Sequence, residues 1–464
     1  MQPHAPDATL SQPTTASARE PPVTPDPLFL RIWHGLRDPL GYLTGLEARF
    51  GDIVTLRTGR TYAIFHPDHV KHVLQDNHAN YDKGEKYRAA LAPLMGNGLF
   101  TSEGAFWLRQ RRIAQGAFQR TQLPVFADTI LESVSVMVDE WEQKARQREP
   151  VALREELTGL TLRAALRMLF GVDASREMPA LIDAVFGVNE EIKLGRVFVP
   201  VHLPTWVSTP GRRRFARSLG TIDEFVYRII ARRRAASDPG TDLIGLLISA
   251  RDPETGESMS DLQLRDEIVT MLNAGHDTVT DAVVWTLVLL AMNPEARERA
   301  REEVLRVAGF DPPSVGSLGA MEFLGRVFRE TLRLYPPAWG FGRTAIQADS
   351  FGRYTIPARS LVLLSQYVVH RSPRFWDRPL MFDPDRFLPA ASAARQKFAY
   401  FPFGSGPRMC IGASLAAMEA PLIVAALLQR FDFELPAGTT VEPSPRISLR
   451  PKGTVPLLVR ALRH

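Results

Sequence analysis

One helical pattern constrains the fold more than any other feature, because it runs from Ser260 to Asn293 without interruption. Ser260 and Gln263 form a capping box at its start, and Pro294 stops it. More than 30 residues at about 1.5 Å each make a helix roughly 50 Å long, which must cross the whole molecule. Residues 282–292 are nearly all apolar, yet too few to span a bilayer. We therefore expect a buried central helix in a large protein.

The rest of the chain favours a fold that is mainly α with small β-sheets. Helical spacing predicts helices over 107–118, 126–146, 154–170, 212–234, 294–307, 321–335 and 412–430. Short runs of β-forming residues predict strands over 53–56, 62–65, 354–356, 361–364, 431–435 and 455–459. Pro421 lies inside the last helix and cannot donate a hydrogen bond back to Ala417, so we expect a kink there.

The N-terminal 27 residues differ in composition from the remainder. They contain seven prolines, with neither the basic start and apolar core of a signal peptide nor an apolar run that could span a membrane. We expect a mobile tail over residues 1–27 and a single domain over residues 28–464. The expected protein has no membrane span and is cytoplasmic.

Charge and cysteine content exclude several classes of function. The net charge is +5, the arginines are scattered, and no basic module is recognisable, so we expect no nucleic-acid binding. A single cysteine excludes disulfides within the chain, cysteine-cluster zinc sites and cysteine-ligated iron–sulfur clusters. It also fits a reducing compartment.

The only cysteine, Cys410, stands in a glycine-containing loop just before an apolar helix. Glycine lets the backbone approach a flat ligand closely, and a helix N-terminus favours a thiolate by lowering the thiol pKa. A thiolate ligand pushes electron density onto haem iron and favours O–O cleavage. Arg408 is placed to pair with a haem propionate. Six residues fit one fixed pattern: Phe403, Gly404, Gly406, Arg408, Cys410 and Gly412.

This pattern resembles the haem-binding loop of the cytochrome P450 family, and a chance match in a chain of this length is rarer than about one in 10,000. The resemblance covers roughly residues 28–464. It implies a haem-thiolate monooxygenase, folded as a triangular prism of helices around a buried haem b. Cys410 is then the axial ligand of the iron, and Phe403, Gly404 and Gly412 contact the cofactor.

Further residues resemble the propionate-binding positions of the family. Trp107 and Arg111 lie four residues apart on one helical face, and both can donate hydrogen bonds to a carboxylate. The resemblance implies that they bind a haem propionate together with Arg408. Arg343 and Lys83 are further candidates for the same task.

A second motif resembles the structural core of the family. Glu330 and Arg333 are three residues apart, so their charges lie together on a helix. Arg386 follows in a segment that resembles the Pro-Glu-Arg-Phe element, with Asp385 where glutamate is usual. The resemblance implies that Glu330, Arg333 and Arg386 form a buried network. Its role would be structural, and breaking it would cost about 3–5 kcal/mol.

The middle of the long helix breaks two rules of helix design. Gly275 costs about 1 kcal/mol relative to alanine, and Asp277 is costly in a buried helix unless it is partnered. Two such violations together indicate function rather than packing. The resemblance places Ala274 and Gly275 in a groove over the iron. Asp277 and Thr278 would then manage the protons that bound dioxygen takes up.

The family resemblance also indicates the substrate pocket and the partners. Its walls would include Ala338, Trp339, Ile447 and Ser448, which suit an apolar lipid, terpenoid, steroid or polyketide. Residues 197–206 are either a plain connector or a mobile lid. Electrons would come from a separate ferredoxin or flavodoxin with its reductase. A face carrying Arg109, Arg112 and Arg120 could attract such an acidic partner.

Two other functions would use the same cofactor. One is a haem-thiolate peroxygenase or an oxygen-independent isomerase, against which the Asp277–Thr278 pair argues. The other is a non-catalytic haem-based sensor, which usually carries an output domain that this sequence does not show.

Overall fold

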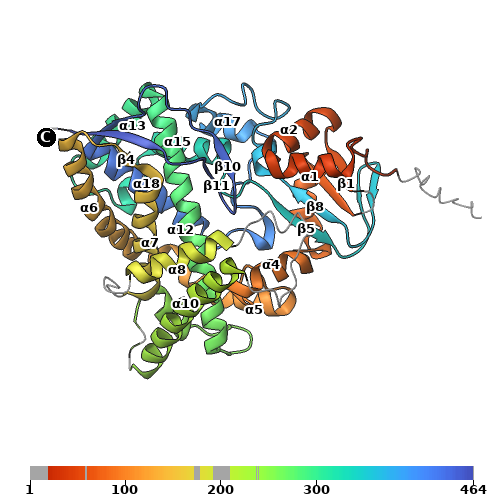
Figure 1. Ribbon diagram of the computed structural model, residues 1–464, viewed down its shortest axis with the longest axis horizontal. Coiled ribbons are helices and arrows are strands. Elements are labelled where there is room, and N and C mark those ends of the chain that lie inside the picture. Colours follow the sequence, from red (N-terminus) through yellow and green to blue (C-terminus); the bar gives the residue numbers. More distant parts are fainter. Residues whose placement is uncertain are drawn as a thin grey trace, which may run out of the picture.

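The structure is a computed structural model that describes residues 19–57, 60–171, 178–191, 209–236, 238 and 240–462. Residues 197–206, the possible lid, lie outside the described residues. Figure 1 shows a helical part on one side of the molecule and a smaller part built on a β-sheet on the other. The expected mainly helical class with small sheets is confirmed.

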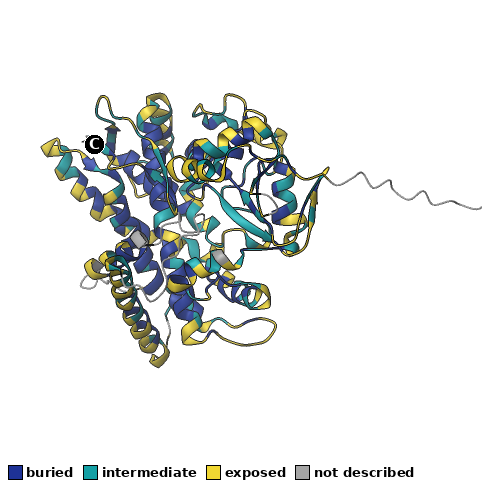
Figure 2. Ribbon diagram, turned by 45° about the vertical axis from the view of Figure 1, so that its right-hand side comes forward, coloured by how far each residue is buried: buried dark blue, intermediate teal, exposed yellow. Residues whose placement is uncertain are grey.

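The long central helix is α12, Asp261–Met292. Ser260 and Gln263 form both hydrogen bonds of the predicted capping box, and Asn293 ends the helix just before the next one. The helices packed against α12 are α7 (Leu153–Phe170), α10 (Pro210–Ala235), α15 (Glu322–Leu334) and α18 (Ala413–Arg430). Buried residues accordingly gather along the helices of this side (Figure 2).

Among the described residues, further helices surround this core. They are α1 (Leu28–Arg37), α2 (Pro39–Phe50), α3 (Pro67–Lys71), α4 (Glu85–Met95), α5 (Gly104–Gln115), α6 (Leu123–Gln147), α8 (Met178–Glu191), α11 (Leu243–Ser249), α13 (Pro294–Ala308), α14 (Val315–Leu318), α16 (Gln366–Val369) and α17 (Pro389–Ala394). Of these, α5, α6 and α13 agree with predicted ranges to within a few residues, and the others were not predicted.

The largest sheet has the strand order β1-β2-β8-β5-β3, with strands β1 (Ile53–Arg57), β2 (Thr61–Ile64), β8 (Leu361–Leu364), β5 (Phe341–Ala345) and β3 (Tyr81–Asp82). Only the β2–β8 pair is parallel. Three smaller sheets join β4 (Val151–Ala152), β12 (Pro456–Ala461) and β9 (Phe431–Glu434); β10 (Pro443–Pro445) and β11 (Leu449–Pro451); and β6 (Asp349–Phe351) and β7 (Tyr354–Ile356).

The segment before α1 is packed against the sheet. The Thr55 N–H donates to the carbonyl of Pro22 at 2.8 Å, and the Thr24 N–H donates to the carbonyl of Thr55 at 3.1 Å. Arg19 forms a bridge with Tyr354. The expected mobile tail over residues 1–27 is therefore wrong for residues 19–27, because proline carbonyls still accept hydrogen bonds although proline has no N–H to donate.

Helix α18 is continuous through Pro421, so the proline does not end it. This helix is also long and apolar enough to cross a membrane, but 67% of it is buried inside the protein. Its apolar composition is therefore that of a core helix, and among the described residues no other helix meets that test.

Candidate functional site

The cysteine loop reaches α18 through two backbone turns that only glycine adopts readily. Gly404 and Gly406 have φ angles of 69° and 66°. A Cβ on Gly406 would overlap the backbone carbonyl oxygen of Leu74, so glycine is required there for space as well. The Cys410 N–H then donates to the carbonyl of Phe403 at 3.0 Å and closes the loop.

The thiol of Cys410 is exposed at the end of this loop. Its surroundings raise the pKa of the thiol by desolvation, while the Gly412 N–H and Arg111 act in the opposite direction. The helix end therefore acts to lower this pKa, as expected, but desolvation outweighs it and the net direction is upward. Coordination to a metal ion deprotonates a thiol outright, so a bound iron would complete the thiolate.

Helix α12 has an uncovered stretch in the middle of its buried length. Ala274 and Gly275 are exposed, although their neighbours Asn273 and His276 are buried. Helix α12 packs against α18, which begins just after Cys410. An open thiol just before α18, and small uncovered residues on the helix that packs against α18, fit a flat iron-bearing group, which requires one soft ligand and close access.

Basic side chains from several elements gather beside the cysteine loop. Burial, followed by the charges of Arg343 and Arg408, holds the pKa of Lys83 well below its usual value. Burial also lowers the pKa of Arg408 to about 10, with Arg343 and Arg111 acting in the same direction. Glu103 contacts Arg408 and accepts from the Lys83 N–H at 3.1 Å. This excess of buried positive charge fits the two propionates of haem.

The predicted propionate ligands therefore lie close together, with partners of their own. Arg408 stacks over the ring of Trp107 at 3.7 Å and donates to the Ser102 carbonyl at 2.9 Å. Arg111 donates to the carbonyl of Met409 at 3.0 Å. The Lys83 ammonium contacts the Phe100 carbonyl. Sequence reasoning did not find Glu103, because a single glutamate before a helix carries no distinct signal.

The acid and the alcohol of α12 are held in different ways. The Thr278 hydroxyl donates to the Ala274 carbonyl at 2.7 Å. Asp277 accepts from Arg154 Nη2 at 3.2 Å, and Arg154 Nε donates to Asp281 at 2.9 Å. The partner that a buried aspartate needs is thus Arg154, at the start of α7. No spacing in the sequence connects Arg154 to α12, so sequence reasoning missed it.

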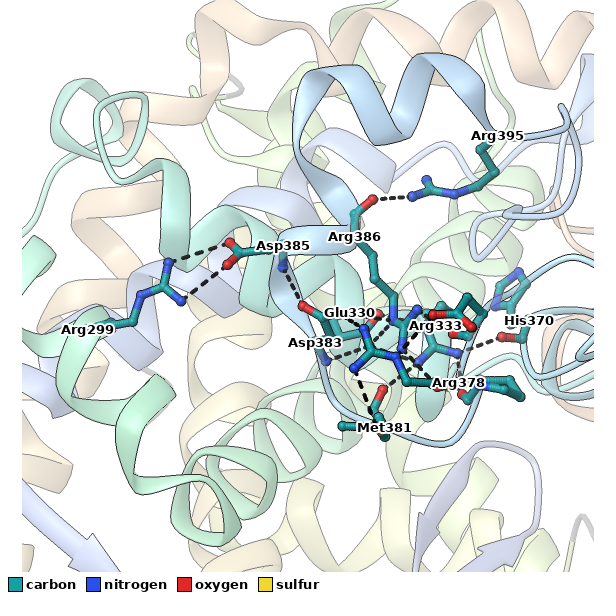
Figure 3. A network of polar contacts seen from close by, with 12 residues as sticks. Arg299, Glu330, Arg333, His370, Arg378, Met381, Asp383, Asp385, Arg386 and Arg395 are labelled. Carbon is teal, nitrogen blue, oxygen red and sulfur yellow. Dashed lines mark hydrogen bonds and ion pairs between the residues drawn. The ribbon is translucent and has the colours of Figure 1, made fainter.

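The predicted network is assembled in the structure (Figure 3). Arg333 donates to both oxygens of Glu330, at 2.6 and 2.8 Å, and neither side chain is exposed. Arg386 Nε lies 3.5 Å from Glu330. Asp385 instead lies 3.3 Å from Arg299.

His370, which the motif does not contain, connects this network to the cysteine loop. Its carbonyl accepts from Arg333 at 2.8 Å, and its Nε2 accepts from the Phe401 N–H at 3.0 Å. The Phe401 carbonyl accepts from the N–H of Gly404 at 2.9 Å. Burial lowers the pKa of His370 to about 3, so the ring is neutral and can accept.

Two of the four predicted substrate-wall residues are buried in the protein. Trp339 packs in a core cluster with Leu40 and Leu449. Ser448 donates to Asp281 and is 3% exposed. Their neighbours Ala338 and Ile447 are exposed, and the assignment of all four residues to the pocket stays a prediction.

The predicted partner-binding face carries less unpaired positive charge than expected. Arg112 forms a bidentate pair with Asp252, both bonds at 2.9 Å, and Arg109 contacts Glu257. Only Arg120 of the three arginines is exposed. Because acidic side chains of the same chain neutralise the other two, this face offers an acidic protein less charge than expected.

Comparisons with known proteins agree with this geometry. The Cytochrome P450 family model matches residues 21–458. Cyclooctatin synthase of Streptomyces melanosporofaciens is 35% identical over 89% of this chain and 89% of that protein. Pentalenene oxygenase of Streptomyces avermitilis is 30% identical over 90% of this chain and 92% of that protein. The crystal structure of the cytochrome P450DA heme domain gives a TM-score of 0.86 at 26% identity, covering 96% of this chain and 98% of that one.

Proposed function

The chain belongs to the cytochrome P450 family and is a haem-dependent monooxygenase, and on this premise we propose that it oxidises an apolar terpenoid with electrons from a separate ferredoxin or flavodoxin. We include in the proposal that residues 28–464 form one catalytic domain, against which residues 19–27 pack, and that it works in the cytoplasm. The names of two relatives, cyclooctatin synthase and pentalenene oxygenase, support the terpenoid class.

The observation that carries the proposal is an open thiol in the loop just before α18, together with an uncovered stretch of α12, the helix that packs against α18. Haem ligated by a thiolate supplies dioxygen activation when it is bound. In this proposal Cys410 provides the ligand of the iron, and Gly404 and Gly412 let the loop approach the haem closely. Phe403 closes the loop through its carbonyl.

The other residues hold and feed this site. The cations Lys83, Arg343 and Arg408 bind the propionates and keep the cofactor oriented. Asp277 would hold and deliver protons for the oxygen chemistry that the haem supplies, and the hydroxyl of Thr278 would act beside it as a hydrogen-bonding group. The network around Glu330 keeps the cysteine loop in place without touching the reactants.

The exposed, uncharged side chains Ala274, Ala338 and Ile447 give the pocket an apolar character. A terpenoid with little polar surface would bury most of its area against such walls. Substrate binding then excludes water from the site, which favours productive oxygen use over release of peroxide.

Spectroscopy of the purified protein tests the proposal. The reduced, carbon-monoxide-treated protein should show the thiolate type of spectrum, and Cys410→Ser should abolish it. Terpenes and hydroxylated terpenes, compared with fatty acids and steroids of similar size, should give the larger loss of iron-bound water. Product formation should need reduced ferredoxin or flavodoxin. Turnover with peroxide alone would instead indicate a peroxygenase, and binding without any product would indicate a sensor.

A further inference from the structure

Arg154 is shared by two carboxylates of α12. Its Nη2 donates to Asp277 at 3.2 Å and its Nε donates to Asp281 at 2.9 Å. The two aspartates are four residues apart and therefore lie on one helical face. Their side chains and that of Arg154 are at most 15% exposed. The two carboxylates use different N–H groups of one rigid, planar guanidinium, so a shift of Arg154 relative to Asp281 also changes its contact with Asp277.

The same contacts continue to the hairpin of β10 and β11. Ser448, in the turn of this hairpin, donates from its hydroxyl to the second carboxylate oxygen of Asp281. Its neighbour Ile447 is 39% exposed. The Trp285 indole also donates to the Leu449 carbonyl at 2.8 Å, which fixes the hairpin to α12. Asp281 therefore joins the hairpin to the arginine that holds Asp277.

Burial makes these charges depend strongly on one another. Burial raises the pKa of Asp281, while Arg154 and Ser448 act to lower it. Burial alone would lower the pKa of Arg154, but Asp281 and Asp277 raise it. Arg450 adds a half-buried positive charge beside the group. Because water screens these charges little, a small change in one contact alters the others.

We propose that a relay transmits contact at the hairpin to the carboxylate of Asp277. This relay, called here the Asp281 relay, consists of Ser448, Asp281 and Arg154. An apolar molecule seated on Ile447 shifts the Ser448 hydroxyl and with it the Asp281 carboxylate. The guanidinium of Arg154 follows Asp281, and its position sets how firmly Asp277 is held. These are positioning residues, since none of them touches the reacting atoms. The inference rests on the proposed function of Asp277 in proton delivery.

Reciprocity gives a test that does not require turnover or the native substrate. If ligand contact at the hairpin alters how Asp277 is held, then a change at Asp277 must alter the affinity for that ligand by the same factor. Imidazole and 1-dodecylimidazole both bind haem iron through a ring nitrogen. Only the second has an apolar chain that can reach the hairpin, so the ratio of their dissociation constants isolates the hairpin contact.

Spectral titration of the haem-loaded protein measures this ratio. We expect Asp277→Asn to change it about fivefold or more, the lower end of ordinary coupling between sites. In proteins that also carry Asp281→Asn or Ser448→Ala, the same substitution should change the ratio less than about twofold.

The matched control is Thr280→Val. The Thr280 hydroxyl lies 2.6 Å from that of Thr161 and joins the same two helices outside the relay. The fivefold effect of Asp277→Asn should persist in this background. An equal effect in every background, or none in any, overturns the relay. If the ratio behaves as expected but Asp277→Asn turns over normally, the relay stands and the proton-delivery role of Asp277 falls.

Discussion

Replacing Arg333 by lysine removes the centre of the buried network while keeping its charge. Arg333 donates five hydrogen bonds, two to Glu330 and one each to the carbonyls of His370, Pro379 and Met381. An ammonium has only three donors, so at least two of these five acceptors lose their partner. Each lost partner costs about 1–3 kcal/mol, which gives an expected loss of about 3–5 kcal/mol of unfolding free energy.

Denaturant titration of the haem-loaded protein measures this loss, followed both by far-ultraviolet circular dichroism and by the thiolate-type haem absorbance. The matched control is Arg329→Lys, one turn away on α15, where the side chain is exposed. That substitution should change stability by less than about 0.5 kcal/mol. If Arg333→Lys stays within about 1 kcal/mol of this control, then the network does not stabilise the fold as argued.

Three further predictions concern the loop and two buried titratable groups. Burial lowers the pKa of His370 in the folded protein to about 3, below the usual 6.5, so between these values the unfolded chain binds a proton that the folded protein does not. The free energy of unfolding should therefore fall by up to about 5 kcal/mol as the pH drops from 6.5 to 3. In His370→Gln, thermal melts over this pH range should show a flatter dependence on pH. Glu419 should make stability fall as the pH rises, the opposite direction to His370, because burial raises its pKa from 4.5 to about 8. Glu419→Gln should therefore stabilise the protein by about 3 kcal/mol at pH 7 and hardly at pH 4, and equal effects at both values would contradict this. Gly406→Ala should prevent haem retention after gel filtration, whereas Gly404→Ala, with similar φ but open space around it, should cost only about 1–2 kcal/mol.

Sequence reasoning succeeded where the signal was local. The capping box at Ser260 and the proline after Asn293 define both ends of α12, because both act through neighbouring backbone groups. The Glu330–Arg333 pair is likewise set by the turn of one helix. Helix bounds elsewhere differ only by residues at the ends, where fraying makes them least defined.

The residues that sequence reasoning did not find depend on contacts between distant segments rather than on local patterns. Arg154 reaches α12 across 123 positions of sequence, and His370 reaches Phe401 across 31. Neither residue stands in a spacing that predicts a partner. The hydrogen bonds of Trp339 to the Arg446 carbonyl and of Ser448 to Asp281 likewise join segments that no local pattern connects.

The packing of residues 19–24 bears on how molecules of this protein behave toward each other. Strand β1 is the outermost strand on its side of the large sheet, and an open outermost strand is a template on which another chain can pair. Pro22 and Thr24 already use the backbone groups of Thr55 on that strand. Proline has no N–H with which to extend the ladder outward. A short, proline-rich segment thus covers the sheet edge and prevents pairing with another molecule. Removing the residues before Pro27 should therefore promote aggregation while leaving the haem site intact.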